Sequence, residues 1–234
     1  LREKEDIVLR KIDSPERRET DERAPRVDDE EYNDFLKYSV SSQKQRGYSS
    51  VELRIPRGDI SAQRLIALAE LEKYFTGMEF RTSLNQNLLI CWVKSGDLGR
   101  LFSRLKETLL DFLYPLTLLD VVACKGALTC NLGLCNSPGL AKELEDVVKE
   151  GFLQKKAFRE LEIRLNGCPN SCAQHPIGRL SFYGLVRRVD GRPVPFYKFL
   201  MGGRKGGDLT ELAKEIGMIP ARNVPRFLGD FPQR

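Results

Sequence analysis

The chain of 234 residues is long enough to bury a sizeable core without disulfide or metal staples. Its content of 41% hydrophobic and 30% charged residues is typical of a soluble globular protein, and no apolar run approaches the roughly 18 residues that a membrane helix needs. Residues 1–6 lack the apolar core of a secretion signal and are too acidic for a transit peptide, so we expect a cytoplasmic protein without a membrane partner.

The net charge of +5 is unevenly distributed along the chain. Residues 1–31 are more acidic than basic, whereas residues 175–234 carry an excess of basic side chains. A basic C-terminal third favours an anionic partner, although a solvated basic surface explains the same pattern. Nothing specific supports nucleic acid, and we expect none as a partner.

The first half of the chain predicts an arm followed by a small α+β unit. Residues 1–45 indicate a charged linker or arm, because their first two thirds are crowded with charge and lack a steady apolar period. Residues 46–114 then follow the order strand, helix, strand, strand, helix, which is typical of a ferredoxin-like layer. The expected elements are a strand at 51–55, a helix capped by Ser61, strands at 78–81 and 88–93, and a helix capped by Asp97.

Residues 115–234 predict a second, mixed α/β unit. Proline follows serine at the expected start of its main helix, an arrangement that suits a helix N-terminus. The expected elements are a strand at 118–123, a helix from Ser137 to Lys149, strands at 161–165, 180–183 and 195–201, and a short helix from Asp208 to Ile216.

Four of the six cysteines form two close pairs, Cys124 with Cys130 and Cys168 with Cys172. Cytosolic thiols stay reduced, so these pairs indicate metal ligands before disulfides. Five residues separate the first pair and three the second, and the wider first loop favours an iron–sulfur core with four iron corners over zinc. Zinc and, less favoured, disulfides remain alternatives. Glycines beside both pairs allow tight turns that aim amide groups at sulfur.

The segments around these cysteines resemble the siroheme-dependent nitrite and sulfite reductase hemoprotein family. The most specific matches are Ala-Cys-Lys-Gly-Ala-Leu-Thr-Cys-Asn-Leu-Gly at 123–133 and Asn-Gly-Cys-Pro-Asn-Ser-Cys-Ala-Gln-His at 166–175. Segments 43–48, 56–60, 81–87 and 200–204 resemble the family in the same order, so the resemblance covers about residues 32–230.

The resemblance implies that residues 115–234 bind a 4Fe-4S cluster and siroheme. The cluster would be held by Cys124, Cys130, Cys168 and Cys172, with Cys172 also bridging to the siroheme iron. The implied reaction is the six-electron reduction of nitrite to ammonia or of sulfite to sulfide, with ferredoxin or a flavoprotein as electron donor. Siroheme carries eight carboxylates, and the cations that we expect near them are Arg81, Lys125, Arg204 and Lys205.

The chain departs from the family in having one ferredoxin-like unit and one cysteine-bearing unit instead of two related halves. It resembles the C-terminal half, and we expect full activity to need the missing N-terminal half, which in the family supplies most substrate-binding cations. We therefore assign no catalytic residue. Two other functions fit the cysteine pairs, a single-cluster electron-transfer module and a zinc-organised nucleic-acid-binding module. Gln174 resembles nitrite-type sequences slightly more.

Three further residues invite a functional interpretation. We expect Cys135 to be a small buried side chain near the cluster and Cys91 to pack within a strand. His175 is the only histidine, and we favour a structural role for it over proton relay or siroheme contact.

Overall fold

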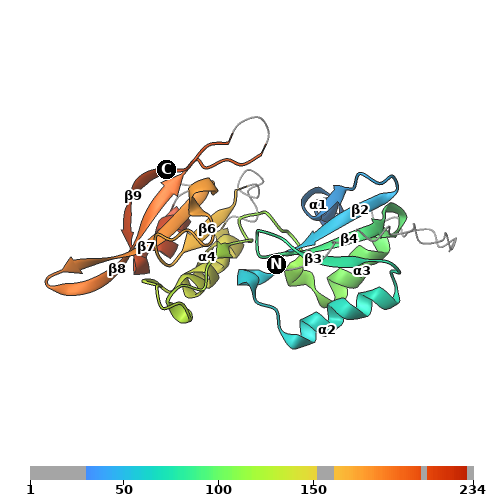
Figure 1. Cartoon of the computed structure of the whole chain (residues 1–234), viewed down its shortest axis with the longest axis horizontal. Helices are drawn as coiled ribbons and strands as arrows, with labels where there is room; N and C mark the ends of the chain where they lie inside the picture. The colour runs from blue at the N-terminus through green and yellow to red at the C-terminus, as the bar shows by residue number, and fades with distance from the viewer. Residues whose placement is uncertain (1–29, 152–160, 207–209, 231–234) are drawn as a thin grey trace, which may run out of the picture.

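Two β-sheets, one in each of two neighbouring units, carry the fold of the computed structural model (Figure 1). The structure describes residues 30–151, 161–206 and 210–230. The first unit has a four-stranded sheet in the order β1-β2-β4-β3, and the second has a five-stranded sheet in the order β5-β6-β7-β8-β9. This is the expected α+β architecture of a ferredoxin-like unit followed by a mixed α/β unit.

The first unit contains the expected strand, helix, strand, strand, helix order in an entirely antiparallel sheet. Ser61 caps its second helix as expected, because the Ser61 Oγ accepts a hydrogen bond from the Arg64 N–H at 3.4 Å. Asp97 occupies the cap position of the third helix without a capping hydrogen bond to the helix backbone, and its carboxylate accepts from Arg100 instead. The elements are α1 (Glu30–Ser39), β1 (Val40–Ser42), β2 (Tyr48–Leu53), α2 (Ala62–Glu70), β3 (Glu79–Thr82), β4 (Leu88–Lys94) and α3 (Leu98–Thr108).

The first unit begins earlier than the expected residue 46. Strand β1 pairs with β2 in the register Val40↔Val51, and Phe35 of α1 lies with its ring centroid 5.1 Å from that of Phe102. Both elements belong to the first core, so residues 30–45 are not part of an arm. Residues 1–29 lie outside the described residues. The missed signal is the spacing of Tyr32, Phe35 and Leu36 on a helix that is otherwise mostly polar, because all three pack on the first core.

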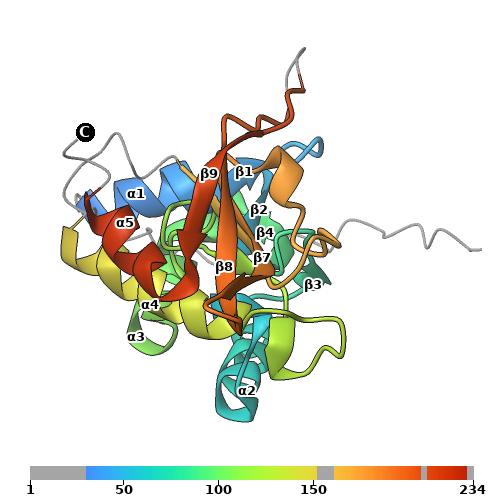
Figure 2. The same cartoon turned by 90° about the vertical axis from the view of Figure 1, so that its left-hand side faces the viewer.

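The second unit combines parallel and antiparallel pairing in one sheet. Strands β5, β6 and β7 are parallel, and β7, β8 and β9 are antiparallel. Helices α4 and α5 lie together beside this sheet (Figure 2) and bury Leu140, Leu144 and Leu228 in its core. The elements are β5 (Val122–Ala123), α4 (Ser137–Gly151), β6 (Ile163–Asn166), β7 (Leu180–Val189), β8 (Arg192–Met201), β9 (Lys214–Pro220) and α5 (Val224–Asp230).

Two expectations for the second unit were wrong. The strand expected at 118–123 is reduced to Val122–Ala123, because a hydrogen-bonded turn at Thr117–Asp120 precedes it. The helix expected from Asp208 to Ile216 is not formed over its described part, since Lys214–Pro220 is strand β9, which pairs with β8 in the register Tyr197↔Ile219. Pairing with an existing sheet edge here overrides a helix-like local pattern.

The two units are joined by buried polar contacts. Arg54 and Arg57 of the first unit both reach Glu145 of α4, at 3.1 and 2.7 Å. Asn87 donates a hydrogen bond of 2.7 Å to Asp120, whose carboxylate is fully buried. Buried charges are retained only when they are paired and hydrogen-bonded, so the relative position of the two units is set by specific partners. Within the described part of the chain, no helix has the length and apolar character to cross a membrane.

Asp120 gives this interface a pH dependence. Burial raises the pKa of Asp120 from 3.8 to about 6, against the opposing hydrogen bonds from Leu116 and Asn87 and the charge of Arg54. The folded chain therefore holds this proton more tightly than the unfolded chain, and the contribution to stability falls as pH rises from about 4 to about 6.

We expect Asp120→Asn to remove this fall, because an amide accepts the same hydrogen bonds and does not ionise. At about 1.4 kcal/mol per pKa unit, the parent should lose about 2 kcal/mol more of its free energy of unfolding than the variant between pH 4 and pH 7. Urea denaturation of both proteins at the two pH values measures this difference. Parallel pH profiles would contradict the assignment.

Candidate metal centre at the cysteine loops

The two cysteine pairs lie on neighbouring loops because their strands are parallel partners. Strand β5 pairs with β6 in the register Ala123↔Leu165. Because the two strands are parallel, the loops that follow them lie at the same end of the sheet. The Cys124 N–H continues the ladder by donating to the Leu165 carbonyl at 3.0 Å. The Gly167 N–H in turn donates to the Cys124 sulfur at 3.1 Å. The structure therefore brings the first loop, residues 124–135, against the second loop, residues 166–175.

Glycine makes this close approach possible. The N–H groups of Leu134 and Cys135 both donate to the Gly167 carbonyl at 3.0 Å. A Cβ atom at Gly167 would lie 2.6 Å from the Cys135 carbonyl oxygen and 2.7 Å from the Gly126 Cα, distances that real Cβ atoms do not adopt. The two loops thus interlock through backbone atoms, with no room for a side chain at residue 167.

The four predicted ligands differ in exposure. Cys168 is buried, Cys124 is half-buried and lies 3.3 Å from the Ser137 hydroxyl, and Cys130 and Cys172 are exposed. All four are free thiols. Among the described residues, however, no three His, Cys, Asp or Glu side chains converge on one point as a metal-binding group. The structure brings the loops together without gathering their four sulfur atoms.

The chemistry of the donor set nevertheless fits an iron–sulfur cluster. The facing loops carry the free thiols of Cys124, Cys130, Cys168 and Cys172, and thiolates are the ligands that such clusters use. The Gly167 N–H on the Cys124 sulfur is the kind of amide contact that stabilises a thiolate and tunes a cluster. The two exposed thiols stand at the open side of the loops, where a bound group has access.

A fully buried arginine supports the second loop from below. Arg164 of β6 donates to the Ala173 carbonyl at 3.3 Å and to the Gln174 side chain at 2.9 Å, directly after Cys172. The same guanidinium donates to Glu162 at 3.1 Å and to Asn85 of the first unit at 2.8 Å. Arg164 was not predicted from the sequence. The available signal was an arginine within a predicted strand, and that strand, β6, lies between β5 and β7 in the sheet.

The expected siroheme-contacting cations fall into two groups. Arg81 pairs with Glu79 at 2.9 Å on the exposed edge strand β3, and Lys125 pairs with Asp59. Both are already engaged with carboxylates. Lys205 is likewise paired with a carboxylate, that of Glu162 at 3.1 Å. Arg204 instead lines clefts of the second unit, as does Arg179, which was not among the candidates.

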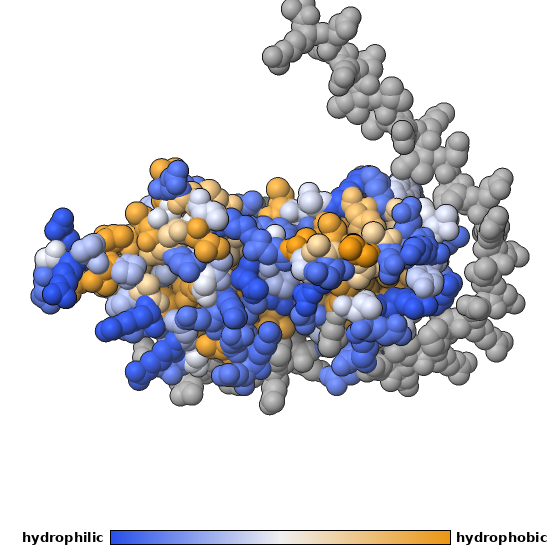
Figure 3. Space-filling model, turned by 90° about the horizontal axis from the view of Figure 1, so that it is seen from below, coloured by the Kyte–Doolittle hydropathy of each residue, from blue (hydrophilic) through white to orange (hydrophobic). Residues whose placement is uncertain are grey.

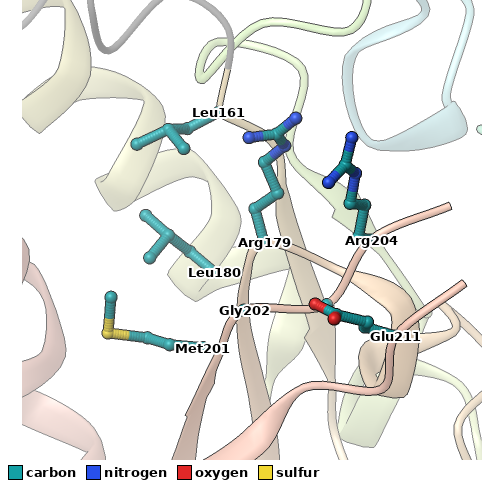
Figure 4. Close-up of a pocket in the computed structure, with 8 residues that line it drawn as sticks. Leu161, Arg179, Leu180, Met201, Gly202, Arg204 and Glu211 are labelled. Carbon is teal, nitrogen blue, oxygen red and sulfur yellow. The ribbon is translucent and has the colours of Figure 1, made fainter. Parts of the chain in front are cut away.

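The larger of these clefts has a volume of about 450 Å³. Arg179 and Arg204 lie side by side there with their guanidinium groups extending in the same direction (Figure 4). Leu161, Leu180 and Met201 form its apolar side. Neither arginine has an ion-pair partner among the described residues, and the carboxylate of Glu211 also lines the cleft. Two guanidinium groups beside one carboxylate still leave the cleft suited to an anionic group on an apolar body.

His175 has a structural environment. Its ring is buried, its Nδ1 accepts a hydrogen bond from the Asn166 amide at 3.1 Å, and it packs 4.7 Å from the Tyr183 ring. Burial lowers the pKa of His175, so it stays neutral at pH 7. The side-chain oxygen of Asn166 accepts a hydrogen bond from the Ala173 N–H at 2.7 Å. His175 thus orients a residue that holds the second loop.

The two remaining cysteines are buried, as expected. Cys135 lies near the Phe196 carbonyl at 3.5 Å, and Cys91 lies within β4. Burial raises the pKa of both thiols.

Apolar side chains are exposed on the first loop beside Cys130, namely Leu128, Leu132 and Leu134. Hydrophobic surface is visible on both units (Figure 3).

The interlocked loops predict that Gly167→Ala destabilises the chain by roughly 1–3 kcal/mol, the usual cost of overpacking. Gly217→Ala in β9 is the matched control, because a Cβ there meets no atom within 4 Å. Thermal denaturation compares the two variants, and we expect a clear drop in melting temperature for Gly167→Ala alone. Equal melting temperatures would show that the loops are not packed this closely.

Comparison with known proteins agrees with this architecture. The family profile described as the nitrite/sulfite reductase ferredoxin-like half domain matches residues 41–108. The structure of the NirA protein of Mycobacterium tuberculosis superposes with a TM-score of 0.67 at 22% identity, covering 84% of this chain and 36% of that one. At this identity the superposition speaks for the fold alone.

Similar sequences include reductases of plants and bacteria. The chain is 32% identical to the chloroplastic ferredoxin–nitrite reductase of Zea mays over 207 residues, covering 86% of this chain and 35% of the relative. It is 29% identical to the NADPH sulfite reductase hemoprotein beta-component of Bacillus subtilis over 157 residues, covering 64% of this chain and 26% of the relative. The chain spans about a third of the length of these relatives or less. Together, these matches show that residues 41–108 are a nitrite/sulfite reductase ferredoxin-like half domain and that most of the chain is similar to one part of the nitrite and sulfite reductase hemoproteins.

Proposed function

We propose that this chain is the cluster- and siroheme-bearing C-terminal half of a reductase that converts nitrite to ammonia or sulfite to sulfide. The observation that carries the proposal is the contact between the two cysteine loops, with the Gly167 N–H 3.1 Å from the Cys124 sulfur. Simple surface turns do not need glycine packing as tight as that between these two loops. Such packing is well suited to hold one inorganic group between two thiol-bearing loops.

The residues that would hold the cluster are Cys124, Cys130, Cys168 and Cys172, and Cys172 would also bridge to siroheme. When bound, these groups supply the storage of electrons that a six-electron reduction needs. The chain's own contribution is to fix the ligands. The Gly167 N–H stabilises the Cys124 sulfur as a thiolate, and the Ser137 hydroxyl lies 3.3 Å from the same sulfur. Arg164 holds the backbone after Cys172.

Among the expected cations, Arg204 remains the preferred partner for siroheme carboxylates, and Arg179 joins it, whereas Lys205 would first have to release Glu162. Planar guanidinium groups bind carboxylates through paired hydrogen bonds, and the free arginines of the cleft can provide them. Arg81 and Lys125 are weaker candidates, because each would first have to release Glu79 or Asp59.

The substrate is proposed only as nitrite or sulfite, and the donor as ferredoxin or a flavoprotein. Relatives named for both substrates support this choice. Gln174, which favours nitrite in the sequence, has its side-chain oxygen engaged by Arg164 at 2.9 Å, so its role here is to support the loop. Because the chain spans only a part of each relative, we propose that full activity needs the remaining half.

Metal analysis of the full chain, purified without oxygen from cells supplied with iron and siroheme, tests the proposal. We expect about four iron and four sulfide per chain. Single Cys→Ser changes at residues 124, 130, 168 and 172 should each remove most of this iron. Cys91→Ala is the matched control, because Cys91 lies in the first unit, and its iron content should equal that of the parent.

Other outcomes would point to other functions. Zinc without iron would overturn the proposal and favour a zinc-organised module. A full cluster content that never supports siroheme binding or nitrite or sulfite reduction, even with the remaining half supplied, would leave an electron-transfer module and overturn the reductase.

A further inference from the structure

The turn between β3 and β4 in the first unit reaches across to both cysteine loops of the second unit. Its three consecutive amides, Asn85, Gln86 and Asn87, each contact a different segment there. Asn87 donates to Asp120 at 2.7 Å, Gln86 contacts the backbone of Ala123, and Asn85 contacts Arg164. A turn on a separate unit thus meets the chain just before the first loop and just beneath the second.

Gln86 replaces a missing strand at the edge of the second sheet. Its side-chain amide donates to the Ala123 carbonyl at 2.9 Å, and its side-chain oxygen accepts from the Ala123 N–H at 3.2 Å. Strand β5 is the last strand of its sheet and has only two residues, so the unpaired side of Ala123 has no strand partner. These two hydrogen bonds fix the residue that immediately precedes Cys124.

Asn85 acts on the second loop through Arg164. Its side-chain oxygen accepts from Arg164 at 2.8 Å and from Lys205 at 3.3 Å. Arg164 is fully buried and holds the Ala173 carbonyl and the Gln174 side chain. A buried guanidinium needs all its donors satisfied, and Asn85 supplies a partner that the second unit does not.

We propose that Asn85 and Gln86 are positioning residues that set the separation of the two cysteine loops. The first unit, which holds none of the four predicted cysteine ligands, then controls the spacing of those ligands in the second. The consequence for a bound cluster rests on the proposed function, whereas the effect on the loops themselves does not. Neither residue touches a reacting group; both act through Ala123 and Arg164.

Differential alkylation of the six thiols in the full, metal-free chain tests the role of Gln86. Exposed Cys130 is the internal reference, and buried Cys91 and Cys135 report opening of each unit. Gln86→Ala and Gln86→Met both remove the amide, and methionine keeps the length of the side chain. We expect the labelling of Cys124 relative to Cys130 to rise about tenfold in both, which corresponds to about 1.4 kcal/mol. Leu84→Ala is the matched control, since Leu84 lies in the same turn and is 83% exposed.

Three results would overturn the role of Gln86. The first is unchanged labelling of Cys124. The second is restored protection of Cys124 in Gln86→Met, which would assign the effect to packing. The third is an equal rise in the labelling of Cys91 and Cys135, which would assign the effect to general stability.

The conservative variant Asn85→Asp tests the second contact. A carboxylate accepts from Arg164 and Lys205 as the amide does, so Cys168 should remain protected in Asn85→Asp and become several-fold more reactive in Asn85→Ala. Equal labelling of Cys168 in both variants would overturn this role.

A loaded chain gives a second readout for the same variants. If iron is taken up, Gln86→Met should shift the midpoint potential of the cluster in a titration followed by electron paramagnetic resonance, and Leu84→Ala should not. An unshifted potential in Gln86→Met would overturn the consequence for the cluster. Failure of the parent chain to take up iron would refute the proposed function, and the thiol labelling of the metal-free chain would still decide the positioning role.

Discussion

The parallel pairing of β5 with β6 is the constraint on which the candidate site depends. Antiparallel pairing would place the two cysteine loops at opposite ends of the strands, whereas parallel pairing places both loops at the same end. The register Ala123↔Leu165 then sets Cys124 opposite Asn166, and the amide proton of the next residue, Gly167, reaches the Cys124 sulfur. Because β5 contributes only two residues, this short pairing needs support from outside its own sheet.

That support comes from buried polar contacts between the units. Gln86 completes the free edge of β5, and the ion pairs of Arg54 and Arg57 with Glu145 hold α4 against the first unit. Charged groups in such a place cost stability when they lose their partners, and a displaced unit would separate Arg54 and Arg57 from Glu145. The interface therefore specifies a single arrangement of the loops, at some expense in stability.

Much of the fold could be predicted from the sequence, because strongly periodic segments carry their own signal. The alternation of Val51 and Leu53 and the serine cap at Ser61 are local features, and the elements they predict are present. Strand β9 could not be predicted, since Ile216 and its neighbours are compatible with a helix until β8 offers an edge to pair with. Helix α1 was missed because its burial rests mainly on Phe35, which packs against residues far along the chain.

The candidate site also has parts that the sequence predicts and parts that it does not. The cysteine pairs and their glycines are visible as motifs, and the structure brings their loops together. The supports of these loops are contacts between distant segments, and neither Arg164 nor Gln86 carries a local pattern that announces its partner. Charge alone was a poor guide to ligands, because Arg81 and Lys125 are engaged by nearby carboxylates that composition cannot locate.

The central claim is that the two loops hold one inorganic group between them. Anomalous diffraction at the iron edge, on crystals of the anaerobically reconstituted chain, tests it most directly. The account predicts one compact group of iron atoms bonded to sulfur from both loops, including Cys124 and Cys172. Iron bonded to one loop alone, or bound away from both, would contradict it.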